Sequence, residues 1–292
     1  MTLAVDDYTT RVSGAPVIVD RPDPVVWSKV DDPELHDFAE RGYIQREAVI
    51  DEARINACLE ELQRIGDDPA MADDPRIIRE SGSEAVRSIF DVHALSDVVW
   101  EAVEYSGAVD LAREILGSDV YVHQSRMNYK PGFAGGAFYW HSDFETWHAE
   151  DGMPRPRACS ASIALTPNRT YNGPLMIMPG TQKYFVQCAG ETPEDYYKES
   201  LVTTAPKIGV PSEEHITELY HSHGLDVLTG PAGSMTMFDC NALHASGGNI
   251  TPMPRANVFI VFNSVENTLV EPFRASSPRP SYIANRDFTP LA

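Results

Sequence analysis

The chain has 292 residues, with 43 acidic and 23 basic side chains, so its formal net charge at pH 7 is −20. Hydrophobic residues make up 42% and charged residues 23%, which is typical of a globular protein long enough for a full core. The negative charge disfavours nucleic acids and anionic membrane surfaces as partners, because both are bound through clustered lysines and arginines.

The sequence contains no clear targeting segment and no pattern of paired cysteines. Its N-terminus is acidic where a secretory signal would be basic, and no apolar run approaches the ~18 residues that span a membrane. None of the four cysteines belongs to a CxxC pair: Cys58, Cys159, Cys188 and Cys240. We therefore expect a cytoplasmic protein with reduced, mostly buried thiols.

The first part of the chain predicts an arm followed by helices. Residues 1–30 are polar and contain prolines, which favours an arm that lies extended over the surface or is partly disordered. Within 32–44, an aspartate followed by a proline starts a short helix with apolar residues on one face. Helical spacing of apolar residues predicts further helices over 50–65, 96–105 and 108–116, the last ending at Gly117.

After Gly117 the pattern changes to short β-like runs separated by proline, glycine and asparagine. Strands are expected at 120–130, 159–165, 173–180, 233–239 and 256–264. A polar insertion over about 192–225 contains a helix near 213–220. The fold class is therefore predicted as α+β, a single domain over 31–292 whose β-rich core, about 118–275, forms a two-sheet jelly roll.

A candidate metal site comes from the segment WHSDFETWHAEDGMP, in which His141 and Asp143 stand two positions apart. Residues i and i+2 of an extended strand project from the same face, so the two side chains can bind one ion. His244 follows in a segment rich in glycine and asparagine. Two histidines and one carboxylate are the ligand set of non-haem Fe(II) oxygenases, which leaves positions open for a co-substrate and O2. An HxD pair alone is a weak motif, because it occurs by chance in many chains.

Arg255 strengthens this hypothesis, because it opens the predicted strand RANVFIVFNS soon after His244. A guanidinium there can bind a carboxylate through two hydrogen bonds. A metal site with an arginine on the next strand suits a co-substrate that has a chelating keto acid at one end and a carboxylate at the other. 2-Oxoglutarate is such a molecule.

The HxD…H…R order, the helical front and the β-rich back resemble the phytanoyl-CoA dioxygenase-like family of Fe(II)/2-oxoglutarate oxygenases. WHSDFETWHAEDGMP, SIALTPNRTYNGPLMIMPGTQKYFV, GPAGSMTMFDCNALHASGGNITP and the closing SPRP resemble its ectoine-hydroxylating members. The resemblance extends from about residue 32 to the C-terminus. It implies a double-stranded β-helix (jelly-roll, cupin-like) core flanked by N-terminal helices, and a homodimer. It also implies one iron, O2 and 2-oxoglutarate as co-substrates, and conversion of ectoine, a compatible solute, to 5-hydroxyectoine with release of succinate and CO2.

The resemblance also implies roles for particular residues. Iron would be held by His141, Asp143 and His244, and Arg255 would bind the distal carboxylate of 2-oxoglutarate. Further contacts to 2-oxoglutarate would come from Asn128, Ser160, Ser246 and Phe138. Ectoine would be contacted by Gln124, Thr146, Trp147, Phe238 and Phe259.

Strand alternation agrees with part of this assignment. In the predicted strand 120–130, Gln124, Arg126 and Asn128 share one face, and His123 and Met127 take the other. Polar side chains that face the inside of a β barrel are costly unless they line a cavity. On the strand after Arg255, Asn257 and Phe259 share its face.

Four aromatic residues are less clear from the pattern. Phe138 lies an odd number of positions from His141, so alternation does not aim it at the metal, although Gly135–Gly136 allow a bulge or bend. Core packing is the usual fate of strand aromatics such as Phe238 and Phe259. Trp147 stands among polar residues, which favours a face open to a cationic ligand such as the amidinium of ectoine.

Other functions and sites remain open at this point. A hydroxylase of free proline or another small amino-acid-like solute would have the same motifs, and a jelly-roll module that merely holds a metal or sugar is a further alternative. A zinc hydrolase is a weaker one, because HExxH is absent from the sequence. We expect His221 and His223 to be surface residues and His148 to be exposed to solvent.

Overall fold

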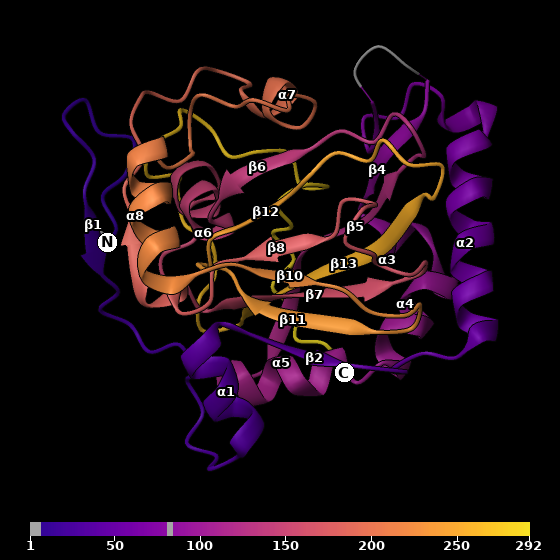
Figure 1. Cartoon of the computed structure of the whole chain (residues 1–292), viewed down its shortest axis with the longest axis horizontal. Helices are drawn as coiled ribbons and strands as arrows, with labels where there is room; N and C mark the ends of the chain where they lie inside the picture. Colours follow the sequence, from indigo (N-terminus) through magenta and orange to yellow (C-terminus); the bar gives the residue numbers. More distant parts are fainter. Residues whose placement is uncertain (1–6, 81–83) are drawn as a thin grey trace.

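The computed structural model describes residues 7–80 and 84–292, and two antiparallel β-sheets dominate it (Figure 1). The larger sheet has the order β2-β11-β7-β13-β5-β4-β3 and the smaller one the order β10-β8-β12-β6. The strands of the larger sheet are β2 (Tyr43–Arg46), β3 (Ile77–Arg79), β4 (Val86–Phe90), β5 (Val120–Lys130), β7 (Ala158–Ala164), β11 (Met235–Asp239) and β13 (Arg255–Ser264). Those of the smaller sheet are β6 (Phe138–His141), β8 (Leu175–Ile177), β10 (Asp226–Leu228) and β12 (His244–Ser246).

The sheets pack face to face through one apolar cluster. It joins Leu175 and Ile177 of the smaller sheet to Tyr43, Phe238 and Phe259 of the larger one. This arrangement of two antiparallel sheets, with helices on one side, is the double-stranded β-helix or jelly roll of an α+β protein, as predicted.

The outer face of the larger sheet is apolar and is covered by helices (Figure 1). Met127, Val258 and Ile260 belong to the main hydrophobic core together with residues of the N-terminal helices. Those helices are α1 (Pro33–Arg41), α2 (Glu52–Asp67), α3 (Val92–Leu95), α4 (Asp97–Tyr105) and α5 (Ala108–Leu116). Because the helices cover only the outer face, the polar residues on the inner face of β5 are free to line a cavity between the sheets.

The helix ends follow the expected signals. Asp32 caps α1, because its side chain accepts a hydrogen bond from the backbone N–H of Glu34 at 2.8 Å, and Pro33 occupies the first turn. Gly42, with φ +79°, ends that helix earlier than predicted, so β2 can start at Tyr43. Gly117 ends α5, as predicted, with φ +60°.

The remaining elements are a short two-stranded sheet, a helix of the polar insertion and several short helical segments. β1 (Ile18–Asp20) pairs with β9 (Tyr184–Val186), and α8 (Glu213–His223) lies in the polar insertion, close to the predicted helix. Short helical segments complete the chain: η1 (Pro69–Met71), α6 (Asp143–Thr146), η2 (Trp147–Asp151), η3 (Thr181–Lys183) and α7 (Tyr197–Ser200). In Figure 1, α7 and the loops beside it pass above β6.

The N-terminal arm is packed more deeply than an arm over the surface would be. From residue 7 onwards, it buries the side chains of Tyr8, Thr10, Arg11 and Arg21. Residues 1–6 lie outside the described part of the chain, and the division into an arm and a single domain over 31–292 stays a prediction. All four cysteines are buried and unpaired, as expected. No described helix has both the length and the apolar character needed to cross a membrane.

Candidate active site

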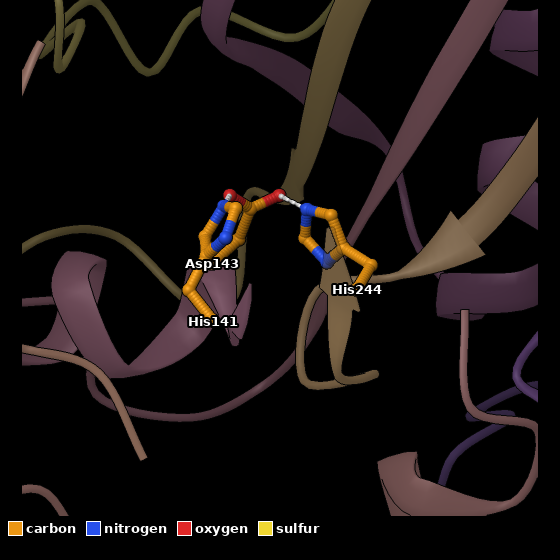
Figure 2. A group of neighbouring side chains, drawn as sticks. All are labelled: His141, Asp143 and His244. Carbon is orange, nitrogen blue, oxygen red and sulfur yellow. Dashed lines mark ion pairs between the residues drawn. The ribbon is translucent and has the colours of Figure 1, made fainter. Parts of the chain in front are cut away.

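Three side chains with metal-binding groups converge at the open end of the sandwich (Figure 2). Antiparallel pairing of β12 with β6 places His244 opposite His141. The Nε2 atoms of His141 and His244 lie 3.5 and 3.9 Å from the two carboxylate oxygens of Asp143. One ligand atom from each of the three residues lies within 4.8 Å of the other two, which is close enough for all three to bind one ion.

Asp143 reaches this position by a different route from the one predicted. The strand ends at His141, and Asp143 starts the short helix α6, which Ser142 caps by accepting a hydrogen bond from the N–H of Glu145. The prediction that His141 and Asp143 share the face of an extended strand is therefore wrong. The two side chains meet because the chain turns between them.

Hydrogen bonds orient both imidazoles. Nδ1 of His141 lies 2.7 Å from the carbonyl oxygen of Tyr139, and Nδ1 of His244 lies 3.0 Å from that of Ala242. A carbonyl oxygen only accepts, so each Nδ1 carries the proton and each Nε2 directs its lone pair towards Asp143.

The charges of the group also suit a cation. Burial opposes ionisation of Asp143, but the neighbouring His244 and His141 outweigh it and lower the pKa of the carboxyl. Burial and the neighbouring His141 lower the pKa of His244 to about 4, so its imidazole is neutral at pH 7. An ionised carboxylate and a neutral imidazole are the protonation states that metal binding requires, so the donor set of two histidines and one aspartate fits Fe(II).

A cavity opens beside the three residues. Six of the predicted site residues line it: Gln124, Phe138, His141, Asp143, Thr146 and Trp147. Its cover comes from the polar insertion, in which Tyr196, Leu201 and Ile208 are lining residues.

The other predicted site residues lie deeper, between the sheets. Phe238 presents its ring edge to His244 at a centroid distance of 5.0 Å, and both belong to the buried interior. The rest are also buried there: Asn128, Ser160, Ser246, Arg255 and Phe259. Within the described residues, the hydroxyl of Ser160 has no hydrogen-bond partner. Phe238 and Phe259 are part of the apolar cluster between the sheets, so core packing accounts for much of their burial.

Arg255 is a buried cation without a counter-charge. It is 2% exposed and stands opposite Lys130 in the β5–β13 ladder. No hydrogen bond or ion pair of its guanidinium is found within the part of the chain that the structure describes, and its Nε is buried and unsatisfied. Burial and the neighbouring Arg126 and Arg87 lower its pKa to about 10. Such a cation is costly unless a bound anion compensates it, which suits the carboxylate of a co-substrate.

Phe138 faces the cavity because of a bulge in β6. His141 pairs with His244, and Phe138 pairs with Ser246, so β6 spans three steps where β12 spans two. The extra residue reverses the alternation between the two ends of β6. The irregularity lies within the strand itself and not at Gly135–Gly136, where the sequence allowed one.

A second bulge changes the position of His123. Val261 pairs with Gln124 and Phe262 with Val122, so His123 has no partner in the ladder. Its ring lies 4.9 Å from that of Trp147, and its Nε2 lies 3.5 Å from Asp151. The expectation that His123 shares the outer face with Met127 is therefore wrong.

Glu145 and Glu150, the acidic neighbours of Trp147, are buried. Their polarity is therefore no sign that the segment around Trp147 is exposed. Arg11 pairs with Glu145 at 2.8 Å and with Glu150 at 2.9 Å. Trp147 itself is 3% exposed and combines core packing with one face on the cavity. These ion pairs join residues far apart in the chain, so no local pattern indicates them.

Two expectations about the other histidines have opposite outcomes. His148 is buried and not exposed, because its ring stacks on Phe273 at 4.0 Å and its Nδ1 lies 2.8 Å from the carbonyl oxygen of Met153. His221 is exposed and His223 half-buried on α8. Among the described residues, the only His/Cys/Asp/Glu group close enough to hold a metal is His141, Asp143 and His244.

Arg126 is a further cavity residue to which the sequence alone assigned no role. Three arginines line the cavity, and two of them face carboxylates, because Arg279 lies 2.6 Å from Asp151 and Arg11 pairs with glutamates. Arg126 donates only to the side-chain oxygen of Gln124 at 3.1 Å, and its Nε is buried without a partner among the described residues. The sequence signal that could have placed Arg126 in the cavity is strand alternation, because Arg126 shares a strand face with Gln124.

Comparison with known proteins gives a consistent result over the whole chain. The model of the family "Phytanoyl-CoA dioxygenase (PhyH)" matches residues 38–257. The "Ectoine dioxygenase" of Nocardia farcinica is 53% identical, over 98% of this chain and 96% of the relative.

Solved structures agree with this. The crystal structure of EctD from S. alaskensis with 2-oxoglutarate and 5-hydroxyectoine is 41% identical, with a TM-score of 0.86 over 96% of this chain and 95% of that one. The structure of the same protein with bound Fe is 40% identical, with a TM-score of 0.85 over 97% and 96%. The chain is thus a member of the phytanoyl-CoA dioxygenase family.

Proposed function

We propose that this protein is an Fe(II)/2-oxoglutarate-dependent dioxygenase that hydroxylates ectoine to 5-hydroxyectoine and releases succinate and CO2. The observation that carries the proposal is the meeting of His141, Asp143 and His244 in a chain that also buries Arg255 without a counter-charge among the described residues. A relative that is 41% identical over nearly the whole chain has been crystallised with 2-oxoglutarate and 5-hydroxyectoine, which supports this substrate.

His141, Asp143 and His244 would hold the iron. When bound, Fe(II) together with 2-oxoglutarate and O2 supplies the oxidant that replaces a carbon–hydrogen bond of the substrate by a carbon–oxygen bond. The hydrogen bonds from Nδ1 of both histidines to backbone carbonyls keep each Nε2 directed at the metal position.

Arg255 would bind the distal carboxylate of 2-oxoglutarate through its guanidinium. Its lack of any partner within the described residues supports this role. Ser160 lies further along the larger sheet, opposite Val261, and is proposed as another contact to 2-oxoglutarate. Asn128, Ser246 and Phe138 are proposed as further contacts. Phe138 and Ser246 are cross-strand partners, so both can border the same molecule.

Ectoine is a small ring that carries a carboxylate and a delocalised amidinium. Arg126, which lines the cavity and forms no ion pair within the described residues, offers its guanidinium for the carboxylate, and Gln124 beside it offers an amide. The amidinium suits the face of Trp147, a contact worth about 0.5–2 kcal/mol. Thr146, Phe238 and Phe259 are proposed to complete the substrate site.

The experiment is anaerobic reconstitution with Fe(II), followed by addition of O2 and 2-oxoglutarate with ectoine, with proline or with no second substrate. The proposal expects succinate and 5-hydroxyectoine in equal amounts with ectoine, and little succinate otherwise. Turnover with proline in place of ectoine would identify the protein as a proline hydroxylase. If no O2 is consumed with any substrate, a jelly-roll module that only binds a metal or sugar would be favoured. Asp143→Ala is the negative control, because it removes the anionic ligand.

We also propose that the protein is a cytoplasmic homodimer. Light scattering on the purified chain tests the oligomer, because a dimer has twice the 32.3 kDa of one chain. A mass of one chain at micromolar concentration would overturn it.

A further inference from the structure

The buried pair Arg87–Glu80 stands outside the site described above and contacts its cover. Arg87 is on β4 and is 1% exposed, and its Nη1 lies 3.0 Å from Oε2 of Glu80. Neither residue lines the cavity, and neither has a role in the proposed chemistry. A buried ion pair contributes little stability compared with apolar residues, so its presence calls for another explanation.

A bulge in β4 directs Arg87 towards the site. Ile78 of β3 pairs with Ser88, and the next residue, Arg79, pairs with Val86, so Arg87 has no partner in this ladder. Ser88 donates a hydrogen bond to Asn128 on the inner face, and Val86 belongs to the outer core. An extra residue in one strand re-aims a side chain, and here it turns the guanidinium towards β6.

The guanidinium links its own strand, β4, to the cover of the cavity and to the start of β6. Its Nε donates to the carbonyl oxygen of Leu201 at 3.2 Å, and its Nη2 donates to that of Ala137 at 3.0 Å. Its plane also lies over the ring of Phe138, 4.0 Å from the centroid. Leu201 follows α7 in the cover of the cavity, and Ala137 precedes β6.

Glu80 completes the connection, because its Oε1 accepts a hydrogen bond from the N–H of Gly136 at 2.9 Å. The approach is possible only beside a glycine. A Cβ on Gly136 would lie 2.5 Å from Nη1 of Arg87 and 2.9 Å from Oε2 of Glu80. The same Cβ would lie 3.3 Å from Thr204 of the cover, so the pair and the cover meet at one point.

From these contacts we infer that Arg87 and Glu80 form a clamp that holds the cover segment, residues 196–210, closed over the cavity and fixes Phe138 beside the metal position. They are positioning residues, because they act through the carbonyls of Leu201 and Ala137 and do not touch the reacting groups. The role rests on the proposed function, since a closed cavity keeps water away from the oxidant and couples its formation to hydroxylation of the substrate.

The test uses Arg87→Lys, which keeps the charge but lacks the planar fork needed to reach three acceptors. In the ligand-free variant, amide hydrogen exchange over 196–210 is expected to be at least about 10-fold faster than in the wild type. Without the clamp, this segment opens more often and exposes its amides to solvent. Arg79→Lys, on the neighbouring strand, is the matched control, because its guanidinium donates to Glu84 and not to the cover. It should leave exchange over 196–210 unchanged.

Gly136→Ala is the second variant, in case Arg87→Lys does not fold. Its methyl group displaces the guanidinium without removing a charge, so faster exchange over the same segment is expected. Unchanged exchange over 196–210 in the folded variants would overturn the clamp.

Activity provides a second readout. In the folded Arg87→Lys, the yield of 5-hydroxyectoine per succinate should fall to about half or less, because an open cavity lets the oxidant decay without substrate. A yield equal to that of the wild type would contradict the clamp. If the wild type makes no 5-hydroxyectoine, the proposed function fails, and the exchange experiment still decides on the clamp.

Discussion

The arginines at and behind this cavity stand in two different electrostatic situations. Arg11 and Arg279 face carboxylates at 2.8 and 2.6 Å, so their charges are compensated within the chain. Arg126 and Arg255 have no carboxylate partner among the described residues, and burial lowers the pKa of both. A charge that is removed from water without compensation is costly, so we propose that the second kind binds anionic ligand groups.

Replacing Arg255 by alanine is expected to raise the KM for 2-oxoglutarate by on the order of 10- to 100-fold, because a charge-assisted hydrogen bond contributes about 1.5–3 kcal/mol. The KM for ectoine should change much less. Steady-state kinetics with each substrate varied in turn measures both values, with Arg255→Lys as the variant that keeps the charge. An unchanged KM for 2-oxoglutarate would contradict the assigned role.

Arg126→Gln should show the opposite selectivity. Its guanidinium lies beside Gln124 and forms no ion pair within the described part of the chain, so its loss removes the partner proposed for the ectoine carboxylate. We expect the KM for ectoine to rise about 10-fold or more, with a smaller effect on 2-oxoglutarate. The same kinetics decide the point, and equal changes in both KM values would argue against a specific contact.

We expect the side chain of Lys130 to take up a proton when 2-oxoglutarate binds. Burial and the neighbouring Arg255 and Arg87 lower the pKa of its ammonium to about 6, so it is mostly neutral above pH 6. A dianion held by Arg255, the cross-strand partner of Lys130, raises that pKa again, and the protein takes up part of a proton at pH 7. Calorimetry in buffers with different ionisation enthalpies measures the uptake. Lys130→Met should show none, and equal uptake by that variant would assign the proton to another group.

At the scale of elements, bulges decide which side chains reach the site. β4, β5 and β6 each carry one extra residue relative to a neighbouring strand. Each bulge reverses strand alternation locally, and so Arg87, His123 and Phe138 face directions that the sequence pattern does not predict. Where alternation is regular, as from Gln124 to Asn128, the prediction of a common inward face agrees with the structure.

The N-terminal arm stabilises the helical turn that carries Trp147 through buried ion pairs. Arg11→Met would leave Glu145 and Glu150 buried without their cation, at a cost of about 3–5 kcal/mol. Urea unfolding of the ligand-free protein should show a lower midpoint. Arg64→Ala, which breaks an exposed pair with Glu61, is the control and should leave the midpoint unchanged. A wild-type midpoint for Arg11→Met would contradict the structural role of the arm.

At the scale of the whole molecule, the charge is divided between surface and interior. The chain carries a net charge of −20, yet buried cations gather beside the cavity. The negative surface repels itself, and raising NaCl from about 0.1 to 1 M shortens the screening length from about 10 to 3 Å. Thermal unfolding is therefore expected at a higher temperature in 1 M NaCl. A lower unfolding temperature would show that salt weakens the buried pairs more than it relieves the repulsion.

The sequence by itself determined the chemical groups of the site and the class of the fold. The order of His141, Asp143, His244 and Arg255 is present in the sequence, and the resemblance to the dioxygenase family implies their roles, while the apolar runs of the strands follow from local period. The tertiary structure decided which arginines have a carboxylate partner and which segments close the cavity. Arg11 meets Glu145, and Arg87 meets Leu201, across more than 100 residues of chain. Local periodicity carries no information on such contacts, because strand bulges and the packing of distant segments create them.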